Sequence, residues 1–156
     1  MQKTKLKSIK NNTPTILVVF GVTGDLAAKK IIPSLWHLFL EGRLPDKLSI
    51  VGFSRRKIKD TEFHTLIRKT ILKHGGAKGS KEKLSKFFKL FSYQPGKFED
   101  QKAYQTLKDH ITKTEDTWGV CANKLFYLAV PPISFKPILK NLASAQPVLR
   151  VLLHVR

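Results

Sequence analysis

One stretch of the sequence, residues 15–27, constrains the fold of this chain more than any other. It begins with six apolar or β-branched residues at 15–20. Such a run without polar alternation is typical of a parallel strand covered on both faces. Gly21 follows directly and Gly24 stands three residues later, so the chain is able to turn sharply there. We therefore predict a buried strand, a tight glycine turn and the beginning of a helix.

The turn has the spacing G-x-x-G-x-x-A, which ends at Ala27. Gly21 would let a ligand approach the backbone, Gly24 would leave the first helical N–H groups uncovered, and Ala27 is small enough for the helix to lie close to the strand. Because N–H groups and a positive dipole at a helix start suit a phosphate, we predict a phosphate-binding turn. Its candidate residues are Gly21, Val22, Thr23, Gly24, Asp25 and Leu26. The spacing differs from the usual G-x-G-x-x-G of dinucleotide sites, and the alternative is a glycine turn that binds nothing.

A second apolar run at residues 48–53 is followed by Ser54, Arg55 and Arg56. Sites for NAD place an Asp or Glu at the end of this strand, where the carboxylate binds a ribose hydroxyl. Here two arginines take that place, and a guanidinium pairs bidentately with the oxygens of a 2′-phosphate. The pattern favours NADP over NAD as the cofactor. The alternative is that Arg55 and Arg56 are two more charges in a very basic chain.

Four stretches together resemble the amino-terminal part of the glucose-6-phosphate dehydrogenase family. They are residues 20–39, 41–45, 50–56 and 124–132, the last of which is Lys-Leu-Phe-Tyr-Leu-Ala-Val-Pro-Pro. The resemblance extends from about residue 15 to about residue 143. It implies an NADP-dependent oxidoreductase of the pentose phosphate pathway. Such an enzyme transfers a hydride from C1 of glucose 6-phosphate to NADP and yields 6-phosphogluconolactone.

Further candidates lie outside the glycine turn. If the strand near residue 125 lies beside the first strand, the carboxyl ends of the two form a crevice where ligands bind. Ala129, Val130 and Pro131 are then candidates to line its nicotinamide side, and the resemblance implies the same use of this stretch. The resemblance also matches Lys30 to a lysine that faces the sugar phosphate. The alternatives are a strand end packed on a helix and a solvated helix lysine.

The catalytic groups that the resemblance implies are absent from this sequence. They are a histidine base within Asp-His-Tyr-Leu-Gly-Lys and a lysine within Glu-Lys-Pro-Phe-Gly, and neither stretch occurs. The five histidines lie in other contexts, so we assign no catalytic residue and no metal site, and we expect no turnover from this chain alone. After residue 145 the sequence departs from the family. Our hypothesis is a frameshift or early stop near that point, which removes the substrate domain.

Apolar runs and helical patterns alternate along the rest of the chain. Strands are predicted at residues 15–20, 48–53, 89–93 and 125–130. Helices are predicted from Asp25, whose carboxylate is expected to cap the first, to about residue 42 with a kink or restart near Pro33, then at 60–74, 81–88 and 100–111, and from Ser134 onward. This alternation predicts an α/β fold with a doubly wound, Rossmann-like parallel sheet that is incomplete relative to the family. Residues 14–145 are expected to form the NADP-binding domain, between a flexible basic tail at 1–13 and an atypical tail at 146–156.

The charge of the chain raises competing functions. Its 156 residues include 29 Lys and Arg against 11 Asp and Glu, a formal net charge of +18, so it will attract polyanions. A basic nucleic-acid-binding protein and a stand-alone NADP-binding module without catalysis are the alternatives. We expect nucleic-acid binding to be non-specific at most, because no motif for it is present. One cysteine and no apolar run long enough for a membrane span indicate a cytoplasmic protein, and we expect no oligomer without the missing domain.

Overall fold

The computed structural model describes residues 12–76 and 79–145 of the chain. The tails predicted at 1–13 and 146–156 therefore lie almost entirely outside the described residues. Within the described part, a parallel sheet is built from β1 (Thr15–Phe20), β2 (Leu48–Ser54), β3 (Phe91–Pro95) and β4 (Asn123–Leu128), in the order β3-β2-β1-β4. This order confirms the predicted neighbourhood of the first and fourth strands.

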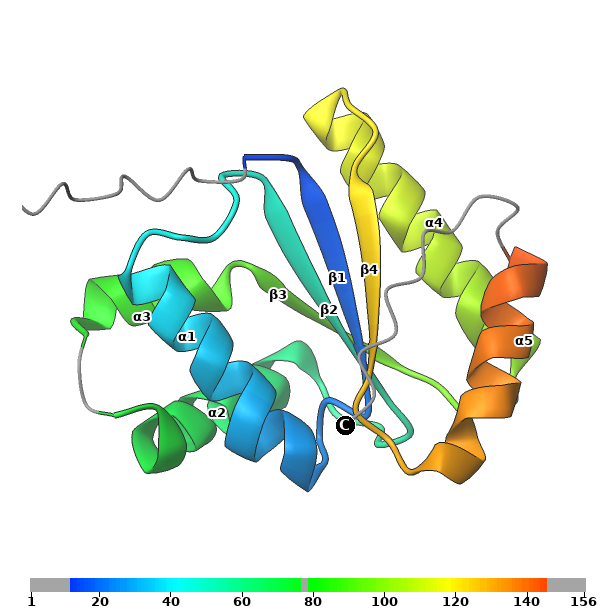
Figure 1. The fold of residues 1–156 in the computed structure, drawn as a ribbon, viewed down its shortest axis with the longest axis horizontal. Helices are drawn as coiled ribbons and strands as arrows, with labels where there is room; N and C mark the ends of the chain where they lie inside the picture. Colours follow the sequence, from blue (N-terminus) through cyan, green and yellow to red (C-terminus); the bar gives the residue numbers. More distant parts are fainter. Residues whose placement is uncertain (1–11, 77–78, 146–156) are drawn as a thin grey trace, which may run out of the picture.

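Helices cover both faces of this sheet (Figure 1). On one side lie the π-helical turn η1 (Ala27–Ile31), α1 (Ile32–Leu40), α2 (Asp60–Thr70), the π-helical turn η2 (Ile71–Gly75) and α3 (Lys81–Phe88). On the other side lie α4 (Gln101–Trp118) and α5 (Phe135–Ala145), which follows the 3-10 turn η3 (Pro132–Ser134). Parallel strands joined by helices on both faces confirm the predicted doubly wound α/β fold.

Two hydrophobic clusters, one on each face, explain why β1 has no polar alternation. Phe20 packs with Phe53 and Tyr104 on the face covered by α4 and α5, and the ring centroids of Phe20 and Phe53 lie 4.9 Å apart. Val19 belongs to the opposite cluster, which also contains Trp36. All five side chains are at most 1% exposed, so both faces of β1 are shielded from water.

The predicted bounds of the third strand are wrong by two residues. The prediction is 89–93, whereas β3 spans Phe91–Pro95. The N–H of Leu90 donates to the carbonyl of Phe87 at 3.1 Å, so the chain is still turning out of α3 at that point. An apolar run alone does not show where the helix ends and the strand begins.

The predicted bounds of the fourth strand are also wrong. The prediction is 125–130, whereas β4 spans Asn123–Leu128. Asn123 is exposed and polar, yet it pairs with Thr15 because its N–H donates to the carbonyl of Pro14 at 2.8 Å. Backbone pairing, which does not depend on side-chain polarity, extends this strand at its amino end.

The fourth helix is longer than predicted. Its apolar face ends at Ile111, which is the predicted end, but α4 continues to Trp118. The added turns are mostly solvated and include Thr114 and Thr117, whose hydroxyls bond to carbonyls four residues earlier. Gly119 then ends the helix with a φ of +66°, a left-handed conformation that glycine adopts at little cost.

The first helix does not break at Pro33. The π-helical turn η1 runs directly into α1, and the N–H of Ile32 donates to the carbonyl of Ala27, five residues earlier. Pro33 lies in the first turn of α1, directly after the π-helical turn, so its missing N–H falls where the hydrogen-bond pattern changes. The predicted kink or restart is thus replaced by a change from π to α geometry.

Candidate functional site

The glycine turn lies at the carboxyl end of β1. Gly21 has a φ of +78°, and its N–H donates to the carbonyl of Phe53 at 2.8 Å. A Cβ placed on Gly21 would lie 2.5 Å from the carbonyl oxygen of Ala129 and 2.6 Å from Cγ1 of Val130. Glycine is needed here both for the backbone conformation and because the end of β4 comes so close.

The predicted nicotinamide-side residues lie directly beside this turn. The N–H of Ala129 donates to the carbonyl of Phe20 at 2.9 Å, one residue after β4 ends. Ala129 is buried, Val130 is half-buried and Pro131 is exposed. The structure therefore brings residues 129–131 beside the glycine turn at the carboxyl ends of β1 and β4, although Ala129 and Val130 form a loop rather than the end of the predicted strand.

A hydroxyl pair ties the glycine turn to the end of β2. The Thr23 and Ser54 oxygens share a hydrogen bond of 2.7 Å, and the N–H of Arg56 lies 3.5 Å from the same Ser54 oxygen. Ser54 is only 5% exposed, so this contact is part of the fold. It positions the backbone of the arginine-bearing loop against the glycine turn. Sequence patterns did not single out this contact, because the two residues are thirty-one positions apart.

Asp25 does not cap the first helix as predicted. Its carboxylate instead pairs with Nζ of Lys29 at 3.5 Å, and the Asp25 side chain is 91% exposed. Leu26 is also exposed. The N–H of Gly24 bonds to the carbonyl of Gly21 at 2.9 Å, whereas the next amides begin the helix and have no earlier carbonyl within it to bond. Those first-turn amides are the donors that the turn can offer to an anion.

Arg55 is held on an aromatic support. Its guanidinium carbon lies 4.8 Å from the centroid of the Phe98 ring. The carbonyl of Phe98 accepts hydrogen bonds from the Tyr104 hydroxyl at 2.7 Å and from Asn141 Nδ2 at 3.0 Å. Burial and the charge of Glu99 raise the pKa of the Tyr104 hydroxyl, which keeps its proton for this bond. Arg55 therefore rests on a segment that is anchored from inside the fold.

The neighbouring Arg56 is fixed through its backbone. Its carbonyl accepts a hydrogen bond from the Tyr93 hydroxyl at 2.5 Å, and the N–H of Tyr93 donates to the Asp60 carboxylate at 3.2 Å. Burial raises the pKa of the Tyr93 hydroxyl, so it remains a donor near neutral pH. The loop after β2 is thus attached to β3, while the Arg56 side chain remains exposed.

A cleft of about 780 Å³ opens beside Arg55. Its lining includes four cations, Arg55, Lys57, Lys59 and Lys97, and two carboxylates, Glu62 and Asp100. The three lysines were not among the residues singled out from the sequence. They gather here because the loops after β2 and β3 end at the same edge of the sheet. With positive charge in excess, the cleft suits an anion such as a phosphate group.

Lys30 lies elsewhere. It is exposed and lines a separate hollow of about 470 Å³, together with His37 of α1 and His74 of η2. This hollow shares no lining residue with the cleft beside Arg55. The structure therefore does not bring Lys30 together with the predicted cofactor residues.

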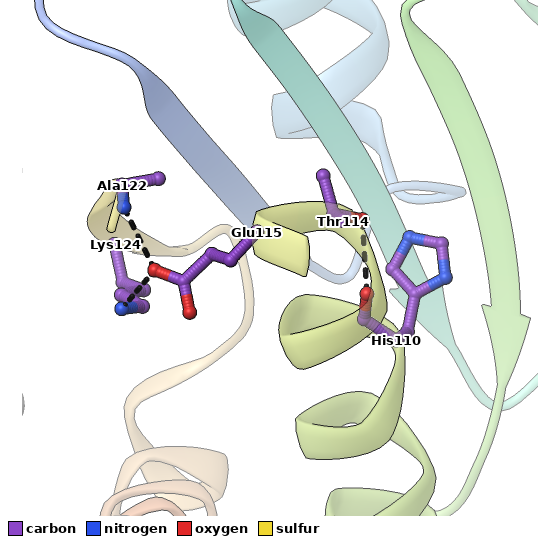
Figure 2. A network of polar contacts seen from close by, with 5 residues as sticks. All are labelled: His110, Thr114, Glu115, Ala122 and Lys124. Atoms are coloured by element: carbon purple, nitrogen blue, oxygen red, sulfur yellow. Dashed lines mark hydrogen bonds and ion pairs between the residues drawn. The ribbon is translucent and has the colours of Figure 1, made fainter. Parts of the chain in front are cut away.

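A charged network at the amino end of β4 has a structural role (Figure 2). The Glu115 carboxylate accepts hydrogen bonds from the N–H of Ala122 at 2.7 Å and from Nζ of Lys124 at 2.5 Å. Burial alone would raise the pKa of Glu115, but these two bonds and the Lys124 charge outweigh it and hold the pKa below its usual range. The network fixes the turn between α4 and β4.

The described histidines are engaged in the fold or lie outside the cleft. His64 Nε2 lies 3.4 Å from the carbonyl of Phe91, and His110 Nε2 lies 3.3 Å from the Ser92 hydroxyl. Burial lowers the pKa of His110. His154 lies outside the described residues. Among residues 12–76 and 79–145, no cluster of three or more metal-ligating side chains occurs, and no helix is long and apolar enough to cross a membrane.

These donors fit a nicotinamide dinucleotide. The first-turn amides of the helix suit a pyrophosphate, and the cationic cleft beside Arg55 lies at the end of β2, where the adenosine end of such a cofactor binds in doubly wound folds. The glycine turn and residues 129–131 meet at the carboxyl ends of β1 and β4. The backbone donors and cations thus lie at the edge of the sheet where a doubly wound fold binds a dinucleotide.

Comparison with known proteins points to one family. Residues 18–153 match the family model described as the NAD binding domain of glucose-6-phosphate dehydrogenase. This match extends past residue 143, where the resemblance described from the sequence motifs ends. The glucose-6-phosphate 1-dehydrogenase of Chlamydia pneumoniae is 36% identical over 88% of this chain and 27% of its own length. That of Schizosaccharomyces pombe is 39% identical over 86% of this chain and 26% of its own length.

Solved structures agree with this. The structure of a glucose-6-phosphate dehydrogenase in complex with its substrate glucose 6-phosphate matches with a TM-score of 0.80 and 29% identity, over 91% of this chain and 29% of that one. The enzyme from Mycobacterium avium matches with a TM-score of 0.77 and 27% identity. The chain thus spans about a quarter of the length of the curated relatives that it matches. It belongs to the glucose-6-phosphate dehydrogenase family and corresponds to the dinucleotide-binding domain at the amino-terminal end of those enzymes.

Proposed function

We propose that this chain binds NADP, with the pyrophosphate at the glycine turn and the 2′-phosphate in the cleft beside Arg55. The single observation that carries the choice of NADP is the excess of positive charge in the cleft at the end of β2, where Arg55 takes the place that a carboxylate has in an NAD site. Arg55 is the main ligand of the 2′-phosphate, supported on Phe98. Arg56 adds a second positive charge from the same loop.

The remaining predicted residues receive roles at the pyrophosphate and at the nicotinamide end of the cofactor. The amides of the first helical turn, near Asp25 and Leu26, donate to the pyrophosphate, and Val22 and Thr23 shape the turn. Residues 129–131 line the nicotinamide side, beside the glycine turn. When bound, the nicotinamide accepts a hydride from a substrate carbon. These residues orient the ring and exclude water from one of its faces.

The complete dehydrogenase reaction is proposed for this domain as part of a whole enzyme, and not for these 156 residues alone. The relatives are named as glucose-6-phosphate dehydrogenases, and we propose that this domain serves hydride transfer from glucose 6-phosphate to NADP, with Lys30 facing the sugar phosphate. Neither the Asp-His-Tyr-Leu-Gly-Lys stretch nor Glu-Lys-Pro-Phe-Gly occurs in these 156 residues. We therefore expect these residues to bind the coenzyme without turnover. We also propose that the protein acts in the cytoplasm.

A titration of the purified chain with NADP and NAD tests this proposal. Arg55→Ala is expected to weaken NADP binding by about 1.5–3 kcal/mol and NAD binding much less, because a charge-assisted phosphate contact is lost. Arg43→Ala is the matched control, since Arg43 pairs with Glu41 at 3.2 Å in the loop before β2. Equal losses for NADP and NAD would refute the role of Arg55. Tight, sequence-dependent binding of a nucleic acid at physiological salt would favour the other class of function.

A further inference from the structure

We infer that Lys97, in the turn after β3, is a specificity-determining residue that binds the 2′-phosphate together with Arg55. The inference rests on the proposed NADP binding and adds a residue from the turn after β3, which the dinucleotide motif does not use. Lys97 and Arg55 line the same cleft, although they are far apart in the sequence.

The turn that carries Lys97 is attached to the turn that carries Arg55. The N–H of Gly96 donates to the carbonyl of Ser54 at 2.9 Å, so the residues just before Lys97 and Arg55 are bonded to each other. A Cβ on Gly96 would lie 2.7 Å from Cβ of Ala103 and 2.8 Å from Cζ of Phe53. The backbone at Gly96 is therefore packed tightly against the core, which fixes where the Lys97 side chain begins.

The residue after Lys97 fixes the other side of the turn. Phe98 is 4% exposed, and its carbonyl accepts the bonds from Tyr104 and Asn141. The guanidinium of Arg55 lies over the same Phe98 ring. Lys97 is thus held between two anchored residues, one bonded to the loop of Arg55 and the other in contact with Arg55 itself.

The charge of Lys97 is free for a ligand. Its side chain is exposed and forms no ion pair with any other described residue. Of the two carboxylates in the cleft, Asp100 is used to begin α4, because its Oδ1 accepts the N–H of Lys102 at 3.0 Å. Two cations on a shared rigid rim can contact one phosphate from two sides, whereas a ribose hydroxyl would gain little from the second.

A matched pair of lysine variants tests the inference. The probes are adenosine 2′,5′-bisphosphate and adenosine 5′-monophosphate, which differ by the 2′-phosphate and need no substrate domain. Lys97→Gln is expected to raise the Kd of the bisphosphate about three- to tenfold and to leave that of the monophosphate within about twofold. Lys97→Arg should retain most of the affinity. The control is Lys102→Gln, an exposed α4 lysine outside the cleft lining, which should change neither Kd.

The outcomes separate this inference from the proposed function. If the unmodified chain prefers the bisphosphate and Lys97→Gln keeps that preference, Lys97 is not a determinant while NADP binding stands. If the unmodified chain binds both probes equally, the proposed NADP specificity fails and the role of Lys97 with it. If Lys97→Gln and Lys102→Gln weaken the bisphosphate to the same extent, the effect is one of net charge and the inference is overturned. Thermal unfolding of each variant verifies that it is folded.

Discussion

The two ends of the parallel sheet differ in whether their cationic side chains have partners within the protein. At the amino end, Lys124 pairs with Glu115, and Lys47 donates to a backbone carbonyl of α4 at 3.1 Å. At the carboxyl end, Arg55 and Lys97 form no ion pair with another described residue and line an open cleft. Removing the partner of a buried cation destabilises the fold, whereas a cation left unpaired at a cleft remains available to an anionic ligand.

The glycine turn of the carboxyl end offers the strongest way to break this comparison. Gly21→Ala is expected to lower the free energy of unfolding by about 3 kcal/mol, because an alanine there adopts a positive φ and its Cβ lies 2.5 Å from a backbone oxygen of Ala129. The measurement is chemical denaturation. Gly42→Ala is the matched control: Gly42 also has a positive φ, +65°, but nothing lies within 4 Å of an added Cβ. The Gly42→Ala variant should lose only about 1 kcal/mol, and equal losses would show that crowding against Ala129 and Val130 is unimportant.

The ion pair of the amino end is the next test. Glu115→Ala is expected to destabilise the fold by about 1–2 kcal/mol, since it leaves the largely buried ammonium of Lys124 and the Ala122 N–H without their acceptor. Denaturant unfolding measures this loss. The exposed pair of Glu82 and Lys86 provides the control, and Glu82→Ala should leave stability unchanged within error. The coenzyme affinity should be the same in both variants, because neither residue lines the cleft.

The same carboxylate predicts a pH dependence. The pKa of Glu115 is lowered in the folded state, so its contribution to stability is fully present above the ordinary carboxyl pKa of about 4.3. It is lost as the pH falls through the folded pKa, where the carboxylate is protonated. The difference in unfolding free energy between the unmodified chain and Glu115→Gln should therefore shrink between about pH 5 and pH 3. A difference that stays constant over this range would mean that the pair is not what stabilises the turn.

The smallest expected effect concerns Tyr93, which positions the loop of the carboxyl end. Tyr93→Phe removes the hydrogen bond to the Arg56 carbonyl. It should raise the Kd of NADP about two- to fivefold and that of NAD less. A side-by-side titration of both nucleotides is the readout. Tyr127→Phe is the control, because Tyr127 lies in β4 and outside the cleft lining. An equal loss of NADP affinity in both variants would argue against a positioning role.

The fold and those parts of the candidate site that directly follow a strand could be predicted from local sequence patterns. β1 is observed at its predicted bounds, because a six-residue apolar run between turn residues suits a parallel strand that is covered on both faces. The glycine turn, Arg55 and Arg56 also follow from the chain, since each lies directly after a strand. Residues 129–131 were expected near Gly21 from the usual strand order, and the parallel pairing of β1 with β4 confirms this.

Other features were decided only by tertiary structure. The polar start of β4 follows from backbone pairing with β1. The end of α4 is different, because the glycine that ends it, Gly119, is a local signal that the apolar pattern did not use. The bond between Thr23 and Ser54 and the cleft that Lys97 and Arg55 both line bring together residues that are distant in the chain. Local patterns report hydrophobic period and turn chemistry, which depend on neighbours in sequence. Charge clusters depend on which loops share an edge of the sheet, and only the packed strand order determines that.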